Sequence, residues 1–217
     1  MKLPQGFRSA SVAAGLKSTG ALDLTIIENQ GPNFTAAAVF TTNKVVAAPV
    51  TWSRQVAKGG IVRAVVLNSG GANACTGPQG FADTHKTAEH VGQSLKVSSG
   101  EVIVCSTGLI GELLPMPKII AGIESIVPVL SNDGLQTSAQ AIMTTDSVPK
   151  IATANFNGAE FAGIAVDPYG QTKAGMTIYG SIKRSEFGLT WSAVTEAGNI
   201  VVGDEIKLNA ELQFIKQ

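Results

Sequence analysis

Hydrophobic positions follow two patterns along the chain, one before and one after about residue 150. In the first part, short apolar runs alternate with longer segments whose apolar residues recur every three or four positions, as in helices. In the second part, apolar and polar residues alternate, as in strands with one buried face. This order predicts an α/β fold of layered helices on mixed sheets, followed by a mainly antiparallel β segment at the C-terminal end.

The expected elements follow from these patterns. Phe81, Ala88, Val91 and Leu95 recur at helical spacing and predict a helix over residues 80–96. The other expected helices span residues 117–126 and 135–143, and strands are expected over residues 22–28, 36–40, 61–67, 101–105, 151–156, 161–166, 177–183, 200–202 and 205–215.

The change of pattern also suggests two domains, with a first domain over residues 1–160 and a β-rich segment over residues 161–217. The chain is 44% hydrophobic and 15% charged, which favours a folded core over disorder. Sixteen basic residues balance sixteen acidic ones, so we expect neither a nucleic-acid nor a membrane partner. The N-terminal sequence lacks the apolar stretch of a signal peptide, and we expect a cytoplasmic protein.

Metal and cofactor chemistry find little support in the sequence. His85 and His90 lie five residues apart, so on a helix they point about 140° apart and do not form a metal pair on one face. Cys75 and Cys105 do not form a CxxC pair and are expected to be reduced thiols. We therefore expect neither a metal nor a cofactor.

Three polar segments follow expected elements and are candidate sites. The glycines of Asn68-Ser69-Gly70-Gly71 allow backbone N–H groups to approach a ligand closely. Ser106-Thr107-Gly108 follows a buried strand and can direct a hydroxyl and an N–H at one point, as an oxyanion hole requires. Met143-Thr144-Thr145-Asp146-Ser147 ends a helix and can contact a polar substrate. For each segment the alternative is a structural turn whose polar groups cap the backbone, and composition does not separate the two.

Taken in order, these segments resemble the α-chain of the ornithine acetyltransferase (glutamate N-acetyltransferase) family over residues 4–158. The residues that carry the resemblance are Pro4-Gln5-Gly6-Phe7, Val12-Ala13-Ala14-Gly15-Leu16-Lys17, Leu22-Asp23-Leu24, Ala38-Val39-Phe40-Thr41-Thr42-Asn43, Ala47-Ala48-Pro49-Val50, and the segments 68–77, 106–112, 114–116 and 141–146.

The resemblance implies a transfer of acetyl from N-acetylornithine to glutamate in arginine biosynthesis, and some family members use acetyl-CoA as the donor. It implies that Thr107 and Gly108 form the oxyanion hole and that Ser147 contacts substrate. Family precursors cut themselves before a threonine, which becomes the N-terminal nucleophile of a β-chain with its own α-amine as base. The resemblance thus also implies oligomers of paired α- and β-chains.

The sequence departs from the family pattern at two points. Gly71 stands where the family has Asn, which removes one amide. The Ala-Thr-Met of the family's cleavage site is not found, and its nearest match is Lys173-Ala174-Gly175-Met176-Thr177, which makes Thr177 the candidate nucleophile. We therefore expect the acetyltransferase to be incomplete in this chain, because the nucleophilic threonine and the β-chain are missing, and a complementing β-chain would restore it.

The last stretch, over residues 165–217, resembles the C-terminal strands of the YceI-like family, which forms lipocalin-like barrels that bind polyisoprenoid lipids. The resemblance rests on Asp167-Pro168-Tyr169-Gly170, the segment 184–191 and Val202-Gly203-Asp204-Glu205-Ile206. Two alternatives to the acetyltransferase follow: a lipid-binding module, or a folded hybrid of two incomplete pieces that has no catalytic function.

Overall fold

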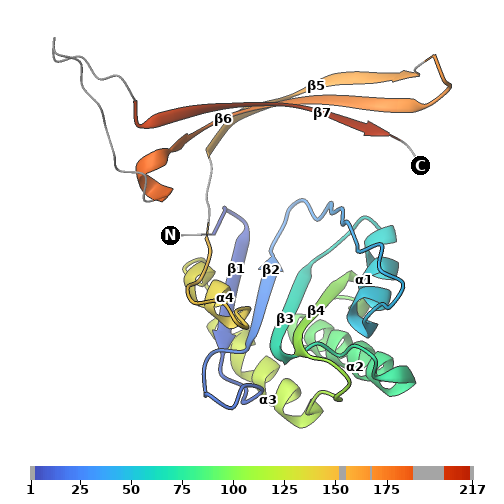
Figure 1. The fold of residues 1–217 in the computed structure, drawn as a ribbon, viewed down its shortest axis with the longest axis vertical. Helices are drawn as coiled ribbons and strands as arrows, with labels where there is room; N and C mark the ends of the chain where they lie inside the picture. Colours follow the sequence, from blue (N-terminus) through green and yellow to red (C-terminus); the bar gives the residue numbers. More distant parts are fainter. Residues whose placement is uncertain (1–2, 152–154, 167, 188–202, 216–217) are drawn as a thin grey trace. The chain divides into compact units, whose positions relative to one another are not determined.

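The computed structural model separates into two compact units, Met1–Lys150 and Ile151–Gln217 (Figure 1). The division falls earlier in the chain than the expected boundary between residues 160 and 161. The structure describes residues 3–151, 155–166, 168–187 and 203–215.

Unit 1 contains a four-stranded mixed sheet. Its strands are β1 (Phe7–Val12), β2 (Leu24–Asn29), β3 (Ala64–Gly71) and β4 (Val102–Leu109), and they lie in chain order across the sheet. The β1–β2 and β2–β3 pairs are antiparallel, whereas β3 and β4 are parallel. The parallel pair requires a crossover, which α2 supplies.

Helices pack on both faces of this sheet. They are α1 (Ala48–Lys58), α2 (Gly77–Leu95), α3 (Met116–Ile126) and α4 (Leu135–Ala141). Helix α3 packs closely over Leu24, because a Cβ at Gly122 would lie 2.6 Å from that side chain. Helix α4 lies on the opposite face, where the Ser138 hydroxyl is 2.9 Å from that of Thr25. Neighbouring residues of β2 therefore face different helices, as the alternation of a strand requires.

The core of unit 1 lies mainly between the sheet and helices α2 and α3. Its fully buried aliphatic side chains come from both layers: Leu24, Ile26, Val66, Val91, Val102, Ile119, Ile123 and Ile126. The fold class expected from the sequence is confirmed, and so are the helices over residues 80–96, 117–126 and 135–143.

Three local expectations are wrong. Residues 36–40 do not form a strand, and Val39 is 98% exposed. The segments 68–71 and 106–108 are not turns, because β3 continues to Gly71 and β4 to Leu109. A register shift between Gly70 and Gly71 accommodates the glycines within the ladder.

Unit 2 is an antiparallel sheet of three strands in the order β5-β6-β7, as the alternating pattern predicts. The strands are β5 (Asn155–Val166), β6 (Thr172–Lys183) and β7 (Glu205–Ile215). The two strands expected over residues 151–156 and 161–166 are one strand, with irregularities in its pairing. The strand expected over residues 200–202 lies outside the described residues. None of the helices in the described ranges has the length and apolar character that crossing a bilayer requires.

Candidate active site

Two polar segments that are far apart in the sequence meet at the carboxyl ends of β3 and β4. Because these strands are parallel, Ser69 pairs with Thr107 and Gly70 pairs with Gly108. The carboxyl end of a parallel strand pair is where α/β folds commonly place ligands. The sheet thus brings together two of the three candidate segments.

Close backbone contact at this point depends on glycine. Gly108 has a φ of +126°, and a Cβ there would lie 2.5 Å from the carbonyl carbon of Gly70. Gly70 has a φ of +110°, and a Cβ there would lie 2.9 Å from the carbonyl oxygen of Leu16. Residues with side chains rarely adopt these φ values and would not fit the available space. The glycines therefore let β3, β4 and the loop around Leu16 approach one another.

Several polar groups of these segments are engaged in holding the structure. The Ser106 hydroxyl donates to Asn68 Oδ1 at 2.6 Å, and Asn68 Nδ2 donates to the carbonyl oxygen of Gly71 at 3.0 Å. The buried Ser69 hydroxyl donates to the carbonyl oxygen of Ala141. Asn68 and Ser69 therefore have structural roles, although their segment is part of a strand and not a turn. Thr107 and Gly108, in contrast, are exposed.

A cleft of about 650 Å³ opens at these strand ends, and Thr107 and Gly108 line it. Its volume falls in the range of small-molecule sites. The third candidate segment also reaches it, through Thr144 and Thr145. The lining residues are 16–19, Gly70, 107–109 and 144–145.

The other two predicted site residues are placed differently. Ser147 is exposed and lies beyond the residues after α4 that line the cleft. Thr177 belongs to unit 2, where it pairs with Glu160 on one side and Glu211 on the other, within the three-stranded sheet. The structure therefore brings together Thr107 and Gly108 with Thr144 and Thr145.

One wall of the cleft is a loop that Asp23 holds in place. The Asp23 carboxylate is fully buried and accepts hydrogen bonds from the backbone N–H groups of Ala14 at 2.7 Å, Leu16 at 2.6 Å and Lys17 at 3.0 Å. The carbonyl oxygen of Asp23 accepts from the Ser69 N–H at 2.8 Å. A single residue thus connects the loop to the end of β3.

Sequence reasoning did not assign a role to Lys17 or Asp23, although both fall within motifs of the family resemblance. A signal was present, because Asp23 is a charged residue directly before a strand, between Leu22 and Leu24. A carboxylate in such a place is usually buried against backbone donors, since burial without partners is costly.

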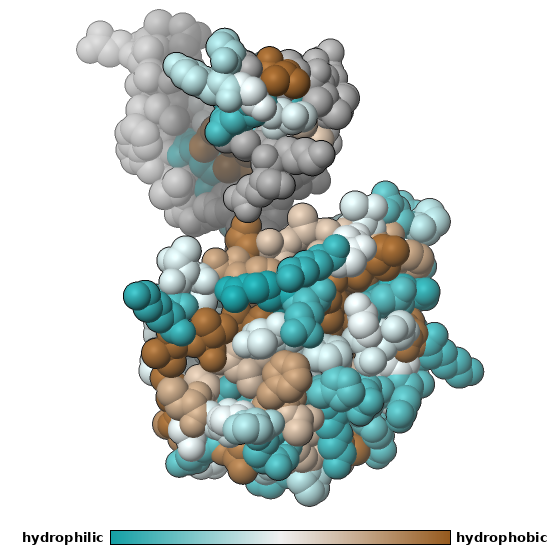
Figure 2. Space-filling model, turned by 90° about the vertical axis from the view of Figure 1, so that its right-hand side faces the viewer, coloured by the Kyte–Doolittle hydropathy of each residue, from teal (hydrophilic) through white to brown (hydrophobic). Residues whose placement is uncertain are grey.

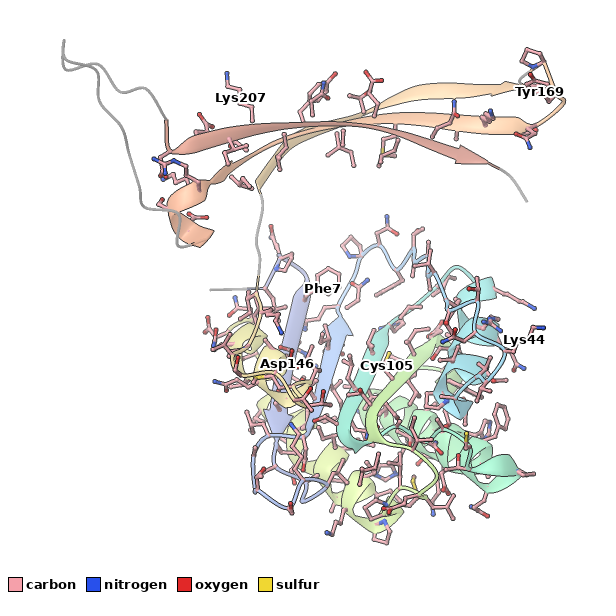
Figure 3. All side chains as sticks on the ribbon, viewed as in Figure 1. Phe7, Lys44, Cys105, Asp146, Tyr169 and Lys207 are labelled. Atoms are coloured by element: carbon pink, nitrogen blue, oxygen red, sulfur yellow. The ribbon has the colours of Figure 1, made fainter. Side chains whose placement is uncertain are left out.

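Two charged groups near the cleft have shifted pKa values. Burial lowers the pKa of Lys17, and the negative charge of Asp23 opposes this shift. The pKa of Asp146, which follows α4 (Figure 3), lies below its usual value because its carboxylate pairs with Lys150 and accepts from the Thr144 N–H. Asp146 is therefore ionised at neutral pH.

A second cleft, of about 420 Å³, is lined largely by apolar residues between the loop over residues 36–40, helix α1 and β3–β4. Cys105 lines it, and burial raises the pKa of that thiol. The view from the α1 side shows hydrophobic residues at the surface among hydrophilic ones (Figure 2). Val39 and Val45 are among the exposed hydrophobic side chains of this region. The surface is therefore more apolar here than at the first cleft.

No three His, Cys, Asp or Glu side chains gather as metal ligands within the part of the chain that the structure describes. His85 packs edge-on against Trp52, with ring centroids 4.9 Å apart, and His90 lies 3.2 Å from Glu124. Neither histidine lines the first cleft. The chemistry of that cleft thus rests on hydroxyls, backbone groups and one ammonium.

Comparisons with known proteins identify relatives of this chain. A sequence model of the ArgJ family matches residues 8–176. The arginine biosynthesis bifunctional protein ArgJ of Streptomyces avermitilis is 55% identical over 161 residues, which cover 74% of this chain and 42% of that protein. The ArgJ protein of Thermobifida fusca is 54% identical over 162 residues, covering 75% of this chain and 42% of its own length. The chain thus spans less than half the length of these relatives.

Solved structures show the same relationship. An ornithine acetyltransferase from Mycobacterium tuberculosis, complexed with ornithine, has a TM-score of 0.66 and 47% identity, covering 81% of this chain and 82% of that one. The ArgJ protein of Bacillus halodurans has a TM-score of 0.61 and 25% identity, covering 96% of this chain and 86% of that one.

The family match reaches residue 176, beyond the end of the resemblance at residue 158, and extends into β6. The comparisons give no support to a YceI-like origin of residues 165–217. Part of that resemblance, including residues 188–191 and Val202, lies outside the described residues. The match over residues 8–176 shows that the chain belongs to the ArgJ family.

Proposed function

We propose that this chain acts in arginine biosynthesis as part of an acyltransferase that moves acetyl from N-acetylornithine to glutamate. The observation that carries the proposal is the position of Thr107 and Gly108, which lie side by side on the wall of a cleft large enough for a small molecule. The ornithine bound to the relative from Mycobacterium tuberculosis is of the same chemical class as the proposed donor.

The proposed role of Thr107 and Gly108 is to stabilise the oxyanion. Attack on the acetyl carbonyl makes its oxygen negative, and donors that are already in place lower the barrier to that step. In the proposal, the Thr107 hydroxyl and the backbone N–H at Gly108 are these donors. Both residues are exposed at the cleft, and glycine leaves the backbone there uncovered.

The nucleophile is proposed to come from a complementing chain. Thr177, the candidate within this sequence, lies in the interior of β6 with a strand paired on each side. Cleavage before Thr177 would break β6 between two paired strands. A β-chain that supplies an N-terminal threonine gives the same chemistry without that disruption. Acetyl-CoA as an alternative donor stays a prediction, and we propose no metal or cofactor.

Binding and transfer test the proposal separately. Calorimetry of the purified chain with N-acetylornithine should show saturable binding, and Thr144→Val should weaken it by removing a lining hydroxyl. Mixing the chain with a β-chain of a close family member should give ornithine release in the presence of glutamate. Thr107→Ala should then reduce this transfer about 10²–10³-fold. Absence of binding by the folded chain, or full transfer by Thr107→Ala, would contradict the proposal.

The partner surface is proposed to include the apolar cleft beside α1. Exposed apolar patches of monomers commonly mark interaction sites. Light scattering on the chain alone should give a mass above the 22.3 kDa of a single chain. A clean monomer that also fails to bind a β-chain would contradict this part of the proposal.

A further inference from the structure

Lys17 is the one charged residue among those that line the first cleft in the described part of the chain. The remaining lining side chains are hydroxyl-bearing or apolar, so the cleft holds a single positive charge and no carboxylate. A site of this composition suits a ligand group that is negative and accepts hydrogen bonds.

The position of Lys17 is fixed by its surroundings. Its backbone N–H donates to the Asp23 carboxylate, and its own ammonium donates to the carbonyl oxygen of Leu22 at 2.9 Å. An ammonium has three N–H donors, so two remain for other acceptors after that bond. The loop is further held by Lys118, whose ammonium donates to the carbonyl oxygen of Gly15 at 2.8 Å.

Asp23 shapes the charge available at the cleft. Its carboxylate is buried beneath the loop and is occupied by three backbone N–H donors. It therefore serves to place Lys17 rather than to neutralise it through a direct ion pair. Partial burial of the ammonium also weakens its hydration, which favours an anionic ligand that replaces water.

We infer that Lys17 recognises the α-carboxylate of the amino-acid substrates in this cleft. The inference rests on the proposed function and adds to it the group that is bound. N-acetylornithine and glutamate differ in their side chains but share an α-carboxylate. One ammonium can therefore bind the acetyl donor in the first step and the acetyl acceptor in the second. Thr107 and Gly108 line the same cleft, so a ligand held at Lys17 by its carboxylate shares the cleft with the proposed oxyanion hole.

The test compares N-acetylornithine with its α-carboxamide, which has nearly the same shape and no negative charge. Calorimetry on the full chain should show that the carboxylate binds about 10- to 100-fold more tightly than the amide. Lys17→Met should bind the two ligands about equally, because the methionine keeps the aliphatic stem and removes the charge. Lys17→Arg should restore most of the preference for the carboxylate.

Lys118→Met is the matched control, since it removes an ammonium that also donates to this loop but does not line the cleft. It should keep the preference of the unchanged chain. If Lys17→Met also prefers the carboxylate to the carboxamide, another group binds the carboxylate. The inference is then overturned, while the proposed function stands. If the unchanged, folded chain binds neither ligand, the proposed function fails together with the inference.

Discussion

Replacing Gly108 by alanine should lower stability more than the same change at Gly111. Gly108 has a φ of +126°, where a side chain is strained at a cost of about 1–3 kcal/mol. Its new Cβ would lie 2.5 Å from the Gly70 carbonyl carbon and 2.8 Å from the Gly71 nitrogen. These are backbone atoms that cannot rotate away, so the strands must move apart at a further cost of about 1–3 kcal/mol. We expect the free energy of unfolding to fall by about 2–6 kcal/mol in total.

Gly111→Ala separates the two contributions. Gly111 also has a positive φ, of +92°, but a Cβ there would meet no atom within 4 Å. Replacing Gly111 should therefore lower the free energy of unfolding only through the strain of a side chain at positive φ, by about 1–2 kcal/mol. Urea denaturation followed by far-UV circular dichroism measures both variants against the unchanged chain. Equal losses for Gly108→Ala and Gly111→Ala would refute the close approach of β3 and β4 at this site.

Three further predictions concern charged and thiol groups. Asp23→Asn places an N–H₂ group toward the backbone N–H donors of the loop, so the free energy of unfolding should fall by about 2–4 kcal/mol in urea denaturation. A fall of less than about 0.5 kcal/mol would contradict the hydrogen bonds to Asp23. Because burial lowers the pKa of Lys17 from 10.5, the folded chain binds fewer protons than the unfolded chain just below that pH. The unfolding free energy of the unchanged chain minus that of Lys17→Met should thus rise as the pH approaches 10.5. If this difference falls instead, folding raises the pKa of Lys17. Burial raises the pKa of the Cys105 thiol, whereas Cys75 is exposed. Iodoacetamide should therefore label Cys105 at least about 10-fold more slowly than Cys75, as measured by peptide mass mapping. Equal labelling rates would contradict the burial of Cys105.

The sequence pattern predicted those elements whose burial depends on apolar side chains. Helix α2 was expected because Ala88 and Val91 recur on one face, and both are fully buried. Strand β1 was not expected, because its sequence FRSASV carries polar residues at buried positions. Ser9 is fully buried and accepts a hydrogen bond from Ser138 at 3.0 Å. That partner lies 129 residues away, and hydropathy along the chain does not report it.

Helix α1 was missed for a related reason. Its buried side includes Trp52 and Ser53, whose polar atoms donate to carbonyl oxygens of β4 at 3.0 and 2.8 Å. These bonds replace part of the apolar stripe that a helix normally shows. At the strand ends, glycine suggested turns, whereas the partner strand and the register shift at Gly71 keep the segments within the sheet. Tertiary pairing decided the structure at both places.

The candidate site could be predicted only as separate segments, and its assembly depends on pairings that the sequence does not state. The pattern of a strand followed by a hydroxyl residue and glycine fitted both an oxyanion hole and a structural turn, and only the family resemblance assigned the hole to Thr107 and Gly108. Their relation to the loop at Lys17 depends on Gly70, which contacts both β4 and the Leu16 carbonyl oxygen. Hydrogen bonds from the loop's backbone N–H groups to the buried Asp23 carboxylate then hold that loop in place. Because each contact excludes a Cβ or requires a buried carboxylate, a change at one of these positions should disturb the whole wall of the cleft. The wall therefore acts as one unit, and effects of combined substitutions there should not be additive.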